Sequence, residues 1–217
     1  MVLPAPTLRA SAFALFAVSS GALLIASCGA APPGQTPRAQ TFEKLPECPA
    51  LRFLPLADGV QWAYDATDES GAEGMFVTRA KRLSGSRFSL GAAQSSHVVE
   101  VRTDGIVRVE SETYALKAPL VLGAEWIGES GAIVRITAAD SIAHVPAGKF
   151  VGCLETTEEL RRAARAAAAP SNPARRVTTT YCPDVGVTTL RVEAWEGSRH
   201  IDERATLRSF GKPVELK

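Results

Sequence analysis

The chain has 217 residues, with 24 lysines and arginines against 23 aspartates and glutamates, so its formal net charge is +1. This length suits a single domain once a targeting segment is set aside. Because the charges nearly balance, no long-range positive field recruits nucleic acid or anionic lipid, and we expect no nucleic-acid partner.

Residues 1–27 are interpreted as a signal peptide. They carry one charge, Arg9, followed by an apolar run of 16 residues from Ala10 to Ile25. A membrane-spanning helix needs about 20 apolar residues, so the run fits the core of a signal peptide better. The following Ala-Ser-Cys28 resembles the end of a bacterial lipobox. The resemblance implies cleavage before Cys28 and lipidation of that cysteine; the alternative is an ordinary secretory signal with a chance cysteine.

Lipidated Cys28 would attach the protein to a membrane. Each buried CH₂ of an acyl chain contributes about 0.8 kcal/mol, so several chains make a stable anchor. Gly29 follows the cysteine, whereas Asp at this place is the usual inner-membrane retention signal of Gram-negative lipoproteins. By resemblance, we therefore expect the outer membrane of a bacterial cell envelope. Residues 28–50 then form a proline-rich tether, and residues 51–217 form a single antiparallel β domain.

The expected domain opens with a motif that occurs twice. The pattern Pro-Leu-x-x-Gly-x-x-Trp ends at Trp62 and again at Trp126. In each copy, a proline-restricted segment meets a glycine turn and then a strand with tryptophan on its buried face. Trp62 and Tyr64 fit a core, which aromatic residues dominate. The alternative is that this Trp-x-Tyr pair lines a ligand pocket.

Short runs rich in β-branched residues follow at close intervals, separated by turns that contain glycine. No long helical periodicity interrupts them. The pattern predicts an all-β domain of about nine to eleven strands, arranged as a curved antiparallel meander sheet like half a barrel. A closed small barrel or a sandwich is the alternative. Four strands are expected between the two copies of the motif: 74–83, 87–94, 97–102 and 106–113. Two more are expected between the second copy and the central hairpin: 132–137 and 140–145.

For the hairpin of the expected strands 97–102 and 106–113, the sequence also predicts which residues pair across the two strands. A two-residue Asp-Gly turn would place Val101 opposite Arg108 and put a charge on the buried face, which disfavours it. A three-residue loop over 103–105, with Gly105 in the left-handed conformation, pairs Val101 with Val107 instead. We predict the three-residue loop.

A long hairpin is expected at the centre of the domain. A Pro-Ala-Gly turn precedes a strand over 150–160, and a return strand covers 177–181. Both are rich in β-branched residues. The intervening segment, Arg161 to Ala174, is rich in arginine and alanine and is interpreted as a mobile surface excursion. One or two helical turns are the alternative. A phosphate or nucleic-acid patch is disfavoured because no aromatic residue interleaves the arginines.

Export would place the other three cysteines in an oxidising compartment. Cys153 and Cys182 lie on the two strands of the expected hairpin and are the natural disulfide pair, which leaves Cys48 free. The alternative pairs Cys48 with either of the others. Zinc binding by the three cysteines lacks a close Cys-x-x-Cys spacing.

Three motifs, in their order along the chain, resemble a group of uncharacterised β-rich bacterial lipoproteins and secreted proteins. The matching segments are Pro55–Tyr64, Val145–Phe150 with Cys153 close behind, and Tyr181–Val187. Cys182 stands where the group more often has a small residue, and the insert is long for the group. The resemblance implies a curved antiparallel sheet and no assigned activity.

No catalytic, cofactor or metal motif stands out. The stretch 128–131 resembles half of a nucleophile elbow but lacks its closing glycine and the following helix, so a hairpin turn is expected. An acidic cluster at 65–69 lacks the alternating oxygen ligands of a calcium loop and is interpreted as a solvated turn. The histidines are scattered, without a second ligand at metal-motif spacing: His97, His144 and His200.

We therefore expect no enzymatic activity, no cofactor and no metal. Two functions remain. The first is an outer-membrane-anchored lipoprotein whose concave β-face binds an apolar ligand, a lipid chain or an envelope partner. The second is a structural or assembly lipoprotein without a ligand pocket. Exposed apolar side chains on the concave face would favour the first, and a filled core the second. The sequence leaves the ligand-binding residues unidentified.

Overall fold

The structure is a computed structural model that describes residues 44–92, 95–161, 174–196 and 199–212. The expected signal peptide, Cys28 and most of the tether lie outside the described residues. The described strands form one twelve-stranded sheet in the order β6-β5-β4-β3-β2-β1-β12-β11-β10-β9-β8-β7. Their bounds are β1 Gln61–Thr67, β2 Glu73–Ser84, β3 Arg87–Ala92, β4 Ser95–Arg102, β5 Gly105–Arg108, β6 Thr113–Lys117, β7 Glu125–Ile127, β8 Ile133–Val145, β9 Gly148–Leu160, β10 Arg175–Cys182, β11 Gly186–Glu196 and β12 Arg199–Gly211.

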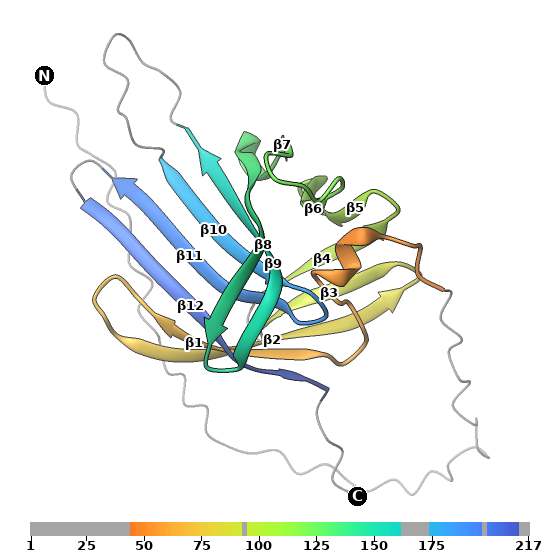
Figure 1. The fold of residues 1–217 in the computed structure, drawn as a ribbon, viewed down its shortest axis with the longest axis horizontal. Helices are drawn as coiled ribbons and strands as arrows, with labels where there is room; N and C mark the ends of the chain where they lie inside the picture. The colour runs from red at the N-terminus through yellow and green to blue at the C-terminus, as the bar shows by residue number, and fades with distance from the viewer. Residues whose placement is uncertain (1–43, 93–94, 162–173, 197–198, 213–217) are drawn as a thin grey trace, which may run out of the picture. The chain divides into compact units, whose positions relative to one another are not determined.

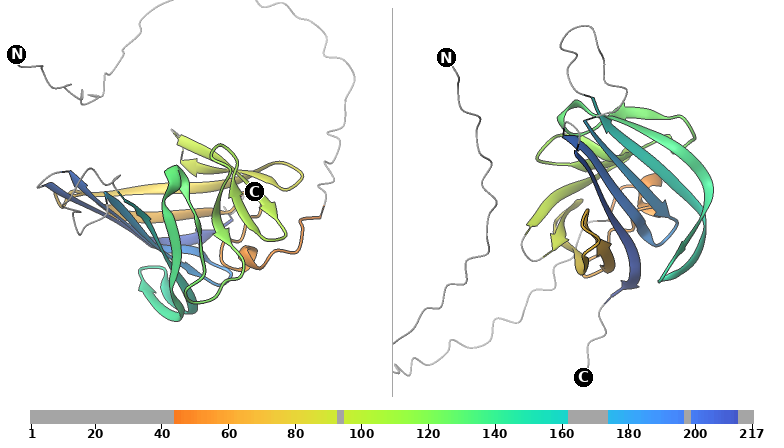
Figure 2. Two further views of the ribbon diagram at one scale, coloured as in Figure 1. Left: turned by 90° about the horizontal axis from the view of Figure 1, so that it is seen from above. Right: turned by 90° about the vertical axis from the view of Figure 1, so that its left-hand side faces the viewer.

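The sheet coils into a nearly closed barrel with one seam. β1 pairs with β12, so β6 and β7 are the two ends of the sheet. Figure 1 shows these ends side by side, and Figure 2 shows the coiled sheet from two further directions. Between the described strands no backbone ladder seals the seam. Instead, Nε1 of Trp126 donates a 3.0 Å hydrogen bond to the carbonyl oxygen of Tyr114. The predicted all-β, curved antiparallel meander is confirmed, and its form lies between the half-barrel and the closed barrel.

A short 3₁₀ helix, η1 (Pro49–Arg52), leads into β1 and packs against the core. Ala50 is fully buried, and the amide of Asp184 in the β10–β11 turn donates a 2.6 Å hydrogen bond to the carbonyl oxygen of Arg52. Leu45 also packs against the core. The packed structure therefore begins several residues before position 51, the expected start of the domain. In the described part of the chain, no helical segment has the length and hydrophobicity needed to span a membrane.

Two of the predicted strand divisions are wrong. The predicted strands 132–137 and 140–145 are one strand, β8, because bulges absorb the extra residues and Asp140 adopts a positive φ of 57°. The predicted strand 106–113 is divided between β5 and β6. The chain turns between them, and Glu112 there has φ 53°. The described residues form twelve strands, more than the nine to eleven expected.

The predicted loop of the β4–β5 hairpin is also wrong. The hairpin has a two-residue turn at Thr103 and Asp104, and Gly105 is the first residue of β5, paired with Arg102. A Cβ atom at position 105 would clash with the carbonyl oxygen of Leu116 on β6. Glycine is therefore needed for the close approach of two strands, and not for a left-handed turn.

The corrected register changes which side chains share the inner face. Val101 pairs with Ile106, and Val99 pairs with Arg108. Val99, Val101 and Ile106 are buried in the core. Because alternate residues of a strand share a face, Arg108 lies on the inner face with Ile106. A charge thus stands where the sequence pattern disfavoured one.

The predicted central hairpin and its disulfide are both present. β9 and β10 pair in register, with Leu154 opposite Tyr181. Cys153 and Cys182 are joined by a disulfide with a Cα–Cα distance of 4.2 Å. Cys48 is a free thiol. Residues 162–173, which make up most of the predicted insert, lie outside the described residues.

Candidate functional site

The inner face of the sheet encloses a cavity of about 330 Å³. This volume falls in the lower part of the range of small-molecule sites, roughly 300–1,000 Å³. Strands β1 to β6 and β8 to β12 contribute to the wall, so it draws on both halves of the sheet. Most of the wall is apolar, and its larger side chains include Trp62, Phe76, Leu90, Val134, Leu190 and Val192.

The Trp-x-Tyr motif of β1 joins the wall to the opposite half of the sheet. Nε1 of Trp62 donates a 2.6 Å hydrogen bond to the carbonyl oxygen of Val185. The hydroxyl of Tyr64 donates a 3.0 Å hydrogen bond to the carbonyl oxygen of Val187. Gly186 has φ 104°, and a Cβ there would lie 2.9 Å from Trp62 Nε1. Two motifs that lie far apart in the sequence are therefore fitted to each other. Both aromatic side chains belong to the core and also line the cavity.

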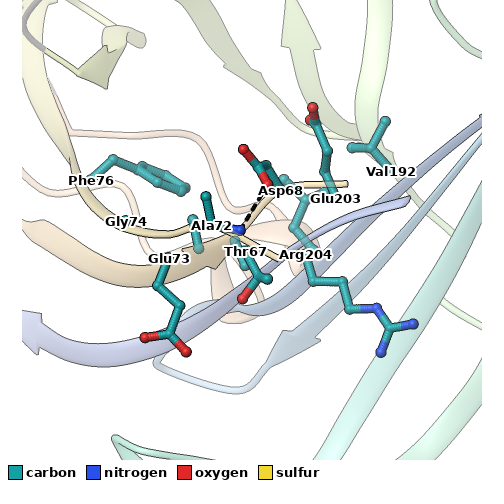
Figure 3. Close-up of a pocket in the computed structure, with 12 residues that line it drawn as sticks. Thr67, Asp68, Ala72, Glu73, Gly74, Phe76, Val192, Glu203 and Arg204 are labelled. Atoms are coloured by element: carbon teal, nitrogen blue, oxygen red, sulfur yellow. Dashed lines mark hydrogen bonds between the residues drawn. The ribbon is translucent and has the colours of Figure 1, made fainter. Parts of the chain in front are cut away.

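A second pocket, of about 370 Å³, continues the cavity toward the β1–β2 turn. The two share Phe76, Leu190, Val192 and Ala205 as lining residues. Figure 3 shows Phe76 and Val192 on either side of this outer pocket, whereas the charged end of Glu73 points away from it. A ligand longer than the inner cavity could extend into this space.

The acidic cluster beside the outer pocket forms a turn. The Oδ1 atom of Asp68 accepts hydrogen bonds from the amide and hydroxyl of Ser70 and from the amide of Ala72. These bonds, that of the Ser70 hydroxyl first, lower the pKa of Asp68. Glu69 forms an ion pair with Arg199. This arrangement agrees with the predicted solvated turn, and in the described residues no group of three or more potential metal ligands comes together.

Polar side chains gather on one wall of the inner cavity. Glu158, Thr156 and Tyr181 lie on the inner face of β9 and β10, and Arg108 faces them from β5. Burial raises the pKa of Tyr181, whose hydroxyl bonds with Thr156 and Thr179. Burial also raises the pKa of Tyr64. Both phenols are therefore neutral near pH 7 and act as hydrogen-bonding groups in the cavity wall.

Three further ionisable groups line the cavity at its more exposed margin: His97, Glu129 and Arg175. Their side chains are exposed, so water screens their charges. For His97, desolvation by surrounding protein atoms comes first among the effects that lower its pKa, and the charge of Arg108 comes second. The other two histidines, His144 and His200, do not line this cavity, and His200 stacks on Trp195.

The sequence indicated one part of this site and missed another. The sequence predicts Trp62 and Tyr64 as core residues, with a pocket lining as the alternative, and in the structure they serve as both. Arg108, Glu158 and Tyr181 were missed, because each lies in an alternating strand pattern that resembles an ordinary half-exposed strand. The available signal was that a two-residue turn in the β4–β5 hairpin would place the charged Arg108 on the buried face.

No protein-family model matches the chain, and no curated protein matches it. A solved structure from Bacteroides fragilis, described as an exported protein of YmcC-like fold, aligns with a TM-score of 0.46 and 12% identity over 74% of this chain and 99% of that one. One from Parabacteroides distasonis, described as a lipoprotein, aligns with a TM-score of 0.40 and 10% identity over 78% of this chain and 100% of that one. The chain is therefore similar, at a low level, to one bacterial protein described as exported and to one described as a lipoprotein.

Proposed function

We propose that this protein is a non-enzymatic lipoprotein of the bacterial outer membrane that binds an apolar ligand inside its coiled β-sheet. The observation that carries the proposal is the cavity of about 330 Å³, whose wall is built mainly from apolar side chains of both halves of the sheet. A structural protein without a ligand would gain stability from filling this space, because an apolar void forfeits packing contacts.

Binding can be measured with N-phenyl-1-naphthylamine, an uncharged probe that fluoresces in apolar surroundings. We expect the purified full-length protein to bind it, and Val192→Trp to raise its dissociation constant by about tenfold or more. That factor corresponds to losing contact with roughly two buried methylene groups. Val192 lines both pockets, so an indole there occupies their junction.

Val151→Trp is the matched control, because Val151 lies outside the lining of either pocket and is 64% exposed. It should bind the probe like the wild type. If the wild-type protein fails to bind the probe, or the two substitutions behave alike, the ligand-binding function is wrong. The structural or assembly role would then be favoured.

Membrane attachment is tested separately at Cys28. Cys28→Ser should abolish palmitate incorporation and release the protein from the membrane fraction or leave it unprocessed, because acyl chains are the proposed anchor. Cys48→Ser is the control and should label normally, since Cys48 lies outside the lipobox. Unchanged labelling of the Cys28 variant would contradict the anchor.

A further inference from the structure

Arg108 holds an unusual place for a charged side chain. The two-residue turn of the β4–β5 hairpin pairs it with Val99 and so directs it to the inner face of the sheet, where it lines the cavity. Its side chain is 25% exposed. A guanidinium so placed has lost much of its water and needs partners in the protein or in a ligand.

The protein partners of Arg108 are loose. Its Nη2 atom forms an ion pair with Glu158, but the 3.8 Å separation from Oε2 is longer than a hydrogen bond. Its Nη1 atom donates a long, 3.4 Å hydrogen bond to the carbonyl oxygen of Tyr114. The guanidinium carries five N–H donors in a planar fork that matches the oxygens of a carboxylate or phosphate. Donor capacity therefore remains at the wall of the cavity.

Arg108 and Glu158 are the least exposed of the charged side chains that line the cavity. Glu129 and Arg175 are exposed and of opposite sign, so solvent screens them and their effects largely cancel. Glu158 is more buried, with a side chain 13% exposed, and it competes with any anion for Arg108. After burial, the charges of Arg108 and Glu158 also influence the pKa of the Tyr181 hydroxyl, the first lowering it and the second raising it.

We infer that Arg108 binds the anionic head of an amphipathic ligand, a carboxylate or a phosphate monoester, whose hydrocarbon chain lies in the apolar cavity. This inference rests on the proposed ligand-binding function and specifies the ligand class. Two N–H groups of the fork bond to two head oxygens, and Glu158 sets the affinity by opposing the negative charge.

Competition against N-phenyl-1-naphthylamine on the full-length protein tests the inference. The competitors share a twelve-carbon chain and differ in the head: dodecanoate, dodecyl phosphate, dodecanol and dodecyltrimethylammonium, each below its micelle-forming concentration. We expect at least one anion to displace the probe at a concentration about tenfold or more below that of dodecanol, because hydrogen bonds to charged groups are worth more than neutral ones. Dodecanoate and dodecyl phosphate together show whether a fatty-acid or a phosphate head is preferred.

Variants at the two wall charges should shift anion binding in opposite directions. Arg108→Gln should remove the anion's advantage and leave dodecanol displacement unchanged. Glu158→Gln should strengthen anion binding several-fold, and it keeps the test decisive if the arginine variant folds poorly. Arg102→Gln is the control, since Arg102 pairs with Glu100 at 2.8 Å and lies outside the cavity lining.

The outcomes separate the two proposals. Probe binding with equal displacement by all four heads in every variant would overturn the inference while leaving the ligand-binding function intact. A preference for dodecyltrimethylammonium would overturn it too, and would assign the head site to Glu158. Absence of probe binding would defeat the ligand-binding function itself.

Discussion

Replacing Trp62 with alanine is expected to lower the free energy of unfolding by about 3–5 kcal/mol, the usual cost of truncating a large buried aromatic residue. Trp62 is 2% exposed, and its Nε1 atom bonds to the carbonyl oxygen of Val185 across the interior. The substitution removes both the packing and the hydrogen bond that joins β1 to the β10–β11 turn. Denaturant unfolding followed by circular dichroism measures the loss.

Two further variants separate the contributions. Trp62→Phe keeps most of the apolar surface but leaves the Val185 carbonyl without its partner, so about 1–3 kcal/mol should be lost. Trp195→Ala is the matched control for the loss of an indole, because Trp195 is only half-buried. It should cost less than Trp62→Ala. Equal losses at positions 62 and 195 would show that Trp62 does not connect the two halves of the sheet.

Removing the disulfide is expected to cost about 3–4 kcal/mol. Cys153 and Cys182 are separated by 29 positions in the sequence, and the bond restricts this length of chain in the unfolded state. The double variant Cys153→Ala and Cys182→Ala should therefore unfold about 6–16 °C lower than the wild type, at roughly 2–4 °C per kcal/mol for a domain of this size.

Cys48→Ala provides the control, because Cys48 is a free thiol. It should leave the melting temperature nearly unchanged. Peptide mapping without reduction should recover a fragment that joins Cys153 to Cys182. Recovery of Cys48 in a mixed fragment, or equal melting of the double variant and the wild type, would contradict the prediction.

Much of the fold could be predicted because β-branched runs and glycine turns mark strands locally. The β9–β10 hairpin is an example: its strands are recognisable on both sides of the insert, and their pairing follows from the need to bury the same face. The disulfide then followed from the positions of Cys153 and Cys182. The strands follow from short-range sequence patterns. The disulfide follows from the oxidising compartment that the expected signal peptide implies.

The β4–β5 register could not be predicted, because its cause lies on another strand. The sequence predicts Gly105 as a turn residue, yet glycine is needed there because the Leu116 carbonyl oxygen of β6 approaches it too closely for a Cβ atom. The sequence shows that a glycine is present but not which neighbour requires it. Moving Gly105 into β5 also turned Arg108 inward.

The candidate site could be predicted only in part for a related reason. An alternating strand pattern shows which residues share a face, but not whether that face meets a filled core or a cavity. Trp62 fits both cases. Glu158 and Tyr181 form a polar part of the cavity wall only because Arg108 faces them. That juxtaposition depends on how far the sheet coils. Apart from the Trp-x-Tyr pair, the local sign of the site is a charge that breaks the expected pattern.

The pairing of β1 with β12 has a consequence for how the chain folds. Every other pair of neighbouring described strands in the sheet is also consecutive in the sequence, so those pairs form by closing loops far shorter than the segment between β1 and β12. Joining β1 to β12 brings together positions 67 and 204, among others. Closing so long a loop costs more entropy than any hairpin, although the cost rises only with the logarithm of length. We therefore expect two meanders, β1–β6 and β7–β12, to assemble early and their joining to limit the rate of folding.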